Sequence, residues 1–304
     1  MPAIVFAQTF PSKPIRIVVP AVPGGGTDIL ARLLSPRLQA IYGQSVVIEN
    51  RAGASTNIGT EYTARAAPDG YTVLIATTPH AVNPTLFGKL PFDSVKDFTM
   101  ISLLARTTTV LVVHPSLPVK SVKELVALAK AKPGQLTSAT SGGTSQFLAV
   151  EMLKSMAGID VLNIPYKGAG AALNDTIAGH VQFQVNTMLA ALPFIRNGRL
   201  RAIAVCGAKR SASLPNVPTI AETIPGFESS GWYALLGPAG LPRDVTMKHY
   251  DAFGKALHTP EITKRLAELG VEVVASTPEE LARLMPQEIV KWGKVVKASG
   301  AKPD

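Results

Sequence analysis

Apolar runs alternate with segments of helical periodicity along the first third of the chain. Residues 14–20, 45–50 and 71–78 are short, mostly β-branched runs bounded by turn residues, which is typical of strands. Between the first two runs, leucine and isoleucine recur at helical spacing over residues 30–41, and a shorter helix is expected over 58–67. Near-continuous apolar strands separated by helices favour a parallel sheet covered on both faces.

The same order of elements starts again after residue 120. A helical segment closed by Pro-Gly is followed by two more units in which a strand leads through a glycine-containing loop into a helix. After a proline-rich passage the chain continues into two helical segments, predicted over 244–269 and 278–297 with a short strand between them. This tail has too few strands for a third domain, so we expect it to pack on the first.

We therefore predict an α/β protein with two lobes that face each other across a cleft. The predicted division is residues 1–10 as an N-terminal tail, 11–111 plus 231–304 as one lobe, and 112–230 as an inserted second lobe. In open α/β sheets, ligands bind at the carboxyl ends of the strands, so each glycine loop is expected to lie at the cleft.

Composition narrows the classes of function. The chain has a net charge of +9, but its basic residues are scattered and aromatic residues make up only 6%, so nucleic-acid binding is not supported. A basic surface also suits acidic small solutes. A single cysteine, Cys206, excludes a disulfide framework, and the five histidines show no metal-ligand spacing, so we predict no metal and no cofactor.

The N-terminus carries a short apolar stretch, residues 3–7, that ends in a small residue before Gln8. It resembles the tail of a secretory signal whose basic part and most of whose apolar part are missing; a frayed cytosolic N-terminus is the alternative. No other stretch approaches the roughly 18 apolar residues that cross a membrane, so the chain is not expected to span one.

The loop "PGGGTD" leaves three interpretations open: a nucleotide loop, a tight structural turn, or a cradle for a small carboxylate. Gly24 and Gly26 fit a dinucleotide pattern, but Ile29 stands where the third glycine belongs. Thr27 and Asp28 stand where a phosphate loop needs Lys and Ser or Thr, and an acidic first turn repels polyphosphate. Free amides at a helix N-terminus suit a carboxylate, which is the interpretation we favour.

The loop "TSGGTSQ" again places glycines and hydroxyls before a helix, which suits a carboxylate. A serine nucleophile at Ser141 or Ser145 is the enzymatic alternative, although the pattern Gly-x-Ser-x-Gly is absent. Further along, Lys167 lies beside glycines and either places a cation at the cleft or is a surface lysine. His80 follows the third strand and either contacts ligand or is hydrogen-bonded within its loop. Trp232 and Tyr233 are expected to pack at the crossing between the lobes, with stacking on a ligand as the alternative.

Several ordered motifs together resemble a known family. They are "PGGGTDILARLL", "VVIENRAGASTNIG", "SGGTSQFLAVEML", "IPYKGAGAALNDTIAGHV" and "LPNVPTIAETIPGFE", spread from about residue 11 to the C-terminus. They are similar to the Bug-type solute-binding proteins, the extracytoplasmic receptors of tripartite tricarboxylate transporters. The resemblance implies a Venus-flytrap fold of the type II periplasmic binding-protein kind, each lobe being a mixed, mostly parallel sheet flanked by helices. It also implies a periplasmic location and a ligand held between the lobes.

The resemblance also implies which residues bind ligand. The ligand-binding positions carried over to this chain are Val22, Gly26, Thr27, Asp28, Thr78 and His80 in the first lobe, and Ser141, Gly143, Thr144, Ser145, Lys167, Ala169 and Gly170 in the second. Two departures leave the identity of the ligand open. Asn186 stands where the family often has Asp, and Ala54, Ser55 and Thr56 stand where a glycine-rich turn is usual.

From these observations we predict a non-enzymatic receptor that captures a small organic carboxylate and delivers it to the membrane components of a tripartite tricarboxylate transporter. It is expected to be monomeric and to bind no nucleic acid. An α/β hydrolase that uses Ser141 or Ser145 is the runner-up, and a sensor subunit for a signalling system is the third possibility.

Overall fold

The structure, a computed structural model, describes residues 10–141 and 144–302. The predicted remnant of a secretory signal and the predicted ligand contact Gly143 lie outside these ranges. None of the helices that the structure describes is long and apolar enough to cross a membrane.

Strands and helices follow each other along the whole chain. The strands are β1 (Ile15–Val19), β2 (Val46–Asn50), β3 (Thr72–Thr77), β4 (Phe98–Val113), β5 (Thr137–Thr140), β6 (Leu162–Pro165), β7 (Phe183–Thr187), β8 (Arg201–Val205), β9 (Ser230–Pro238) and β10 (Val271–Val273). The helices are α1 (Gly26–Tyr42), α2 (Asn57–Ala64), α3 (Pro79–Leu86), α4 (Val122–Ala131), α5 (Ser145–Ala157), α6 (Ala169–Ala178), α7 (Met188–Arg196), α8 (Arg243–Leu257), α9 (Pro260–Glu268) and α10 (Pro278–Ser299), with short 3-10 turns η1 (Ala54–Thr56) and η2 (Ile220–Glu222).

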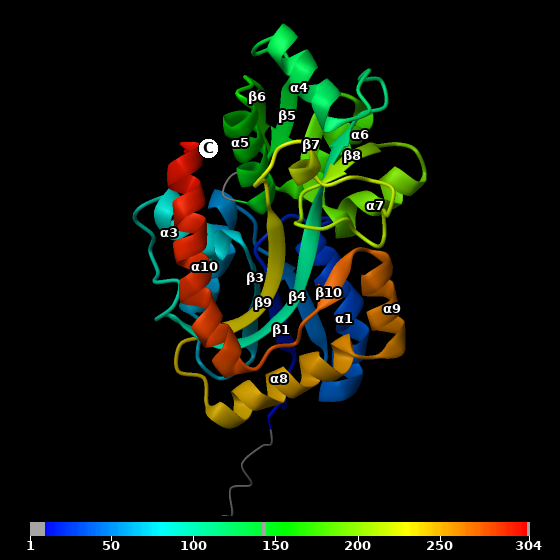
Figure 1. The fold of residues 1–304 in the computed structure, drawn as a ribbon. Coiled ribbons are helices and arrows are strands. Elements are labelled where there is room, and N and C mark those ends of the chain that lie inside the picture. Colours follow the sequence, from blue (N-terminus) through cyan, green and yellow to red (C-terminus); the bar gives the residue numbers. More distant parts are fainter. Residues whose placement is uncertain (1–9, 142–143, 303–304) are drawn as a thin grey trace, which may run out of the picture.

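The strands form one mixed sheet in the order β2-β1-β3-β9-β4-β7-β5-β6, with β8 and β10 also paired to β4. Strands β1, β2 and β3 are parallel to one another, and so are β5, β6 and β7. Between these parallel groups, β9 and β4 run antiparallel through the middle of the molecule (Figure 1). The expected two-lobed α/β fold is confirmed, and the antiparallel centre is the part that the strand pattern did not predict.

Strand β4 belongs to both lobes. It pairs with β9 from Phe98 to Thr108 and with β7 from Thr109 to Val113. We call the part built on β1, β2, β3, β9 and β10 the first lobe, and the part built on β5, β6, β7 and β8 the second lobe. The boundaries predicted from the sequence, after residues 111 and 230, lie within β4 and at the start of β9.

The two lobes are packed against each other away from the sheet as well. Phe147 and Leu148 on α5 of the second lobe belong to the same buried apolar cluster as Trp232 on β9 and Trp292 on α10. On the other side, Leu189 on α7 packs into the core beneath α1. The C-terminal helix α10 lies beside α3 and reaches α5 (Figure 1), so it contacts both lobes.

The helical segment expected over 244–269 is two helices instead of one. Helix α8 ends at Leu257, and α9 begins at Pro260 after the N-cap Thr259. Proline has no N–H to give and suits the first turn of a helix, so the Thr-Pro pair starts a new helix.

Candidate ligand-binding site

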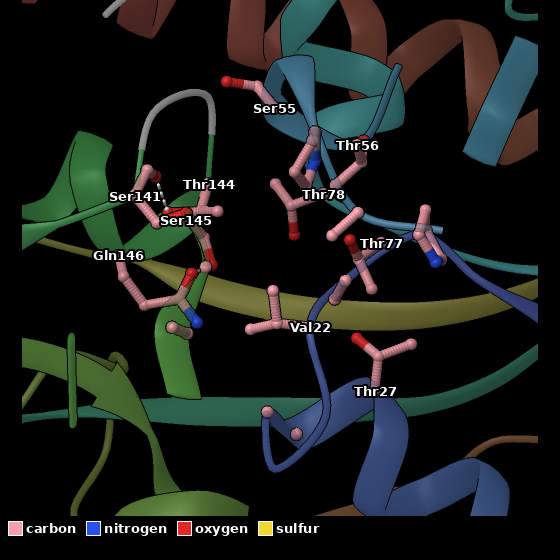
Figure 2. A pocket seen from close by; sticks show the side chains of 18 of the residues that line it. Val22, Thr27, Ser55, Thr56, Thr77, Thr78, Ser141, Thr144, Ser145 and Gln146 are labelled. Atoms are coloured by element: carbon pink, nitrogen blue, oxygen red, sulfur yellow. Dashed lines mark hydrogen bonds between the residues drawn. The ribbon is translucent and has the colours of Figure 1, made fainter. Parts of the chain in front are cut away.

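A cavity of about 680 Å³ lies between the lobes and is lined by both (Figure 2). Among its described lining residues, Lys167 is the one with a charged side chain. Hydroxyl side chains dominate the polar part of the wall: Thr27, Ser55, Thr56, Thr77, Thr78, Thr107, Ser141, Thr144, Ser145 and Thr187.

Six helices begin at this cavity. Their N-cap residues, all of which line it, are Gly25 (α1), Thr56 (α2), Thr78 (α3), Thr144 (α5), Gly168 (α6) and Thr187 (α7). Only Thr144 accepts a hydrogen bond from its own helix through its side chain. The first amides of a helix carry partial positive charge and lack intrahelical partners, so these six ends favour an anion between the lobes.

Asp28 shapes the first glycine loop from behind. Its carboxylate accepts hydrogen bonds from the Gly24 amide, from Arg32 Nε and from Asn50 Nδ2, each at 3.0 Å. Burial alone raises the pKa of Asp28, but the hydrogen bonds from Arg32, Gly24 and Asn50 outweigh it and hold the pKa below its usual value. Asp28 does not line the cavity; it fixes the loop whose amides do.

Gly26 is required by the packing around it. A Cβ at this residue would lie 2.5 Å from Tyr233 Oη and 2.8 Å from Thr187 Oγ1, which is closer than carbon and oxygen approach. The residue comes from α1, while Tyr233 lies on β9 and Thr187 caps α7. The first amides of α1 therefore meet the central strands and the second lobe without a side chain between them.

The structure brings together most of the residues predicted to bind ligand. Those that line the cavity are Val22, Gly26, Thr27, Thr78, Ser141, Thr144, Ser145, Lys167 and Ala169. Figure 2 shows Val22 and Thr27 below the cavity, Thr78 on one side of it and Ser145 on the other. The predicted residues that the structure describes and places outside the lining are Asp28, His80, Gly170 and Asn186.

His80 is buried in the first lobe. Its Nε2 donates to the Ser94 carbonyl at 2.8 Å, and its ring packs edge-on against Phe98 with centroids 4.8 Å apart. Burial lowers the pKa of His80 to about 4, so the ring is neutral at pH 7. Its role is to tie α3 to the following loop.

Asn186 and Gly170 support the site without facing it. Asn186 is fully buried; its Nδ2 donates to the Ala169 carbonyl at 3.2 Å and its Oδ1 accepts from the Thr187 amide at 2.7 Å. It thus joins the N-termini of α6 and α7. A Cβ on Gly170 would lie 2.9 Å from the Pro23 carbonyl oxygen, so α6 touches the first glycine loop, backbone to backbone, across the cleft.

Sequence reasoning did not assign several polar residues of the wall to ligand binding. They are Ser55, Thr56, Thr77, Thr107, Gln146, Thr187 and Tyr233. Thr187 has a recognisable signal, because it is a hydroxyl residue between a strand and a helix. Thr107 has none, because it lies within β4 and reaches the cavity only where that strand crosses between the lobes.

The described lining contains no histidine, aspartate or glutamate that could act as a general base for Ser141 or Ser145. Ser145 Oγ is instead 3.3 Å from Gln146 Oε1. Among the residues that the structure describes, no group of three or more His, Cys, Asp or Glu is placed to hold a metal ion.

Comparison with known proteins identifies the family. The family model described as the tripartite tricarboxylate transporter family receptor matches residues 30–301. The chain belongs to this family. The resemblance to the Bug-type receptors is thereby confirmed: BugT of Bordetella pertussis is 37% identical over 304 residues, covering 99% of this chain and 93% of BugT.

Two solved structures share the fold closely. Rpa4515 of R. palustris, solved with adipate, superposes with a TM-score of 0.93 at 36% identity over 97% of this chain and 100% of that one. MatC of Rhodopseudomonas palustris, solved with bound malate, gives a TM-score of 0.90 at 31% identity over 94% of this chain and 100% of that one.

Proposed function

We propose that this receptor closes its two lobes on a small organic carboxylate and delivers it to the membrane components of a tripartite tricarboxylate transporter. The observation that carries the proposal is the ring of six helix N-termini around a cavity with one cationic and no acidic side chain in its described lining. Backbone amides and hydroxyls donate hydrogen bonds to a carboxylate in fixed directions, which reduces the entropy lost on binding.

The same wall argues against other ligands. A cation would meet the positive ends of helices and Lys167, and no carboxylate among the described lining residues would neutralise it. Relatives with the same fold were solved with adipate and with malate, both of which are small dicarboxylates. We extend that class of ligand, and not either compound, to this chain.

The remaining parts of the proposal concern the cellular location, the oligomeric state and the absence of enzymatic activity. We propose that the protein acts in the periplasm as a monomer without enzymatic activity. The apolar stretch at residues 3–7 supports export, and the absence of histidine, aspartate and glutamate from the described lining around Ser141 and Ser145 supports binding without turnover.

A thermal-shift panel of mono-, di- and tricarboxylates, including aromatic acids, tests the proposal. A ligand present at 100 times its Kd stabilises the folded state by about 2.7 kcal/mol, which raises Tm by several degrees. Lys167→Gln should weaken binding of the best acid, whereas Lys120→Gln, an equal change of charge on an exposed residue of the second lobe, should not. Stabilisation by sugars or cations and by no carboxylate would show that the proposal is wrong.

A further inference from the structure

The wall segment Gly53–Thr56 has a left-handed backbone at four successive residues. The φ angles are +130° at Gly53, +44° at Ala54, +51° at Ser55 and +79° at Thr56. Only glycine adopts this region without steric cost, and three of the four residues are not glycine. Such strain persists only where surrounding contacts enforce it, and it gathers at functional sites.

Side chains behind the wall hold this segment in place. Asn83, buried on α3, donates from Nδ2 to the Ser55 carbonyl and to Asn57 Oδ1, both at 2.8 Å. Thr60 Oγ1 donates to the Thr56 carbonyl at 2.9 Å. These anchors use the backbone of the segment and leave its side chains free.

The hydroxyls of Ser55 and Thr56 are left without a partner among the described residues. Neither makes a hydrogen bond to any residue that the structure describes, and both residues line the cavity. Figure 2 shows them on the wall formed by the first lobe, with Ser141 and Ser145 on the wall formed by the second. Glycines here would remove the strain, but they would also remove both hydroxyls.

A hydroxyl side chain can recognise a group that helix N-termini cannot, because it accepts hydrogen bonds as well as donating them. The amides and Lys167 suit a carboxylate, whereas Ser55 and Thr56 can both donate to and accept from a ligand hydroxyl. A site built to hydrogen-bond a ligand hydroxyl rejects the analogue without it, because its own polar groups are then left unpaired.

We propose that Ser55 and Thr56 are specificity-determining residues that select carboxylates bearing a hydroxyl on the carbon chain over the same acids without it. The inference rests on the proposed function and names the class of ligand within it.

Matched pairs of acids test the selection directly. The pairs are lactate and propionate, malate and succinate, and 2-hydroxyadipate and adipate, each measured by titration calorimetry with the full chain. In the pair whose length fits the cavity, we expect the hydroxylated acid to bind about tenfold or more tightly. Equal binding within every pair that binds overturns this inference and leaves the receptor function standing. Binding of none of the six, nor of any acid in the thermal-shift panel, overturns both.

Variants of Thr56 separate the hydroxyl from the shape of the wall. Thr56→Val keeps the branched side chain and should reduce the preference for the hydroxylated acid, measured as the ratio of the two Kd values, about fivefold, as should Ser55→Ala. Thr56→Ser keeps a hydroxyl and should keep the preference. Retention of the full preference in both Thr56→Val and Ser55→Ala overturns the inference.

The strain gives a second readout that a purely structural role would not produce. Thr56→Gly should raise the Tm of the ligand-free protein by about 2 °C, because glycine tolerates the left-handed backbone. The same variant should lose affinity for the hydroxylated acid about fivefold, so stability and binding move in opposite directions. A fall in both quantities would mean that Thr56 acts only in folding, which overturns the inference.

Discussion

Gly170 lies where the two lobes come within backbone distance, so adding one methyl group there tests whether this contact belongs to the ligand-bound state. In the structure a Cβ at Gly170 would be 2.9 Å from the Pro23 carbonyl oxygen and 3.3 Å from both the Gly24 carbonyl carbon and the Gly25 amide nitrogen. Because all three neighbours are backbone atoms, no side chain can turn away to make room. Gly170→Ala must move α6 and the first glycine loop apart.

The size of the effect follows from that geometry. Relieving the contact needs a displacement of about 0.5 Å, enough to lose a quarter to a half of the dispersion energy of neighbouring contacts. Overpacking of this kind costs about 1–3 kcal/mol. If the cost falls on the closed state that holds ligand, a value of about 2 kcal/mol raises Kd about thirtyfold.

Titration calorimetry with the best-binding acid measures this change, and Gly254→Ala provides the matched control. Gly254 lies inside α8 and a Cβ there would meet nothing within 4 Å. Alanine in place of a helical glycine should add about 0.5–1 kcal/mol of stability and leave Kd unchanged. Binding by Gly170→Ala as tight as that of the wild type would refute the view that this backbone contact closes the cleft.

Three further predictions concern buried polar groups. Asp28→Ala leaves the Gly24 amide and one N–H of the Asn50 amide without an acceptor and should lower the free energy of unfolding by about 2 kcal/mol in urea titrations. Asp28→Asn retains an acceptor oxygen and should cost less; equal costs would contradict the role of the carboxylate. Glu288 Oε2 accepts hydrogen bonds from the indole N–H groups of both tryptophans of the chain, Trp232 at 2.9 Å and Trp292 at 3.0 Å. Glu288→Ala should therefore shift the intrinsic tryptophan emission, and Glu288→Gln should shift it less. Unchanged emission spectra would exclude this arrangement. Burial lowers the pKa of two histidines, His80 and His249, to about 4. As pH falls below about 6.5, the unfolded chain takes up protons on these histidines before the folded protein does, so the free energy of unfolding should decline progressively down to pH 4. Equal free energies of unfolding at pH 7 and pH 4.5 would contradict this prediction.

The outer strands of the first lobe could be predicted because their signals are local. The apolar runs that become β1, β2 and β3 are bounded by turn residues, and helical spacing marks α1 between two of them. The pairing of β4 with β9 has no local signal. It joins residues such as Leu103 and Ala234 that are far apart in sequence, so only the folded chain shows it.

Loop positions in the site were predictable for a similar reason, and side-chain directions were not. Parallel strands end at one edge of a sheet, which brings the loops of Thr27, Thr78 and Thr144 to one cavity. A short polar side chain at a given sequence position in such a loop can turn either toward the ligand or back toward the backbone, and the sequence pattern is the same in both cases. Asp28 and Asn186 turn back, and this choice depends on partners from other elements.

The two crossings between the lobes lie side by side. Thr108 on β4 pairs with Ser230 on β9, and Thr109 Oγ1 donates to the Ser229 carbonyl at 3.4 Å, so the second lobe leaves and re-enters the first at adjacent points. A segment whose ends are adjacent can be exchanged for its counterpart from a relative without redirecting the flanking backbone. An exchange of residues 109–229 would therefore replace the second lobe's part of the cavity lining, ten of the 29 described lining residues, in one genetic step while the first lobe's part is inherited intact.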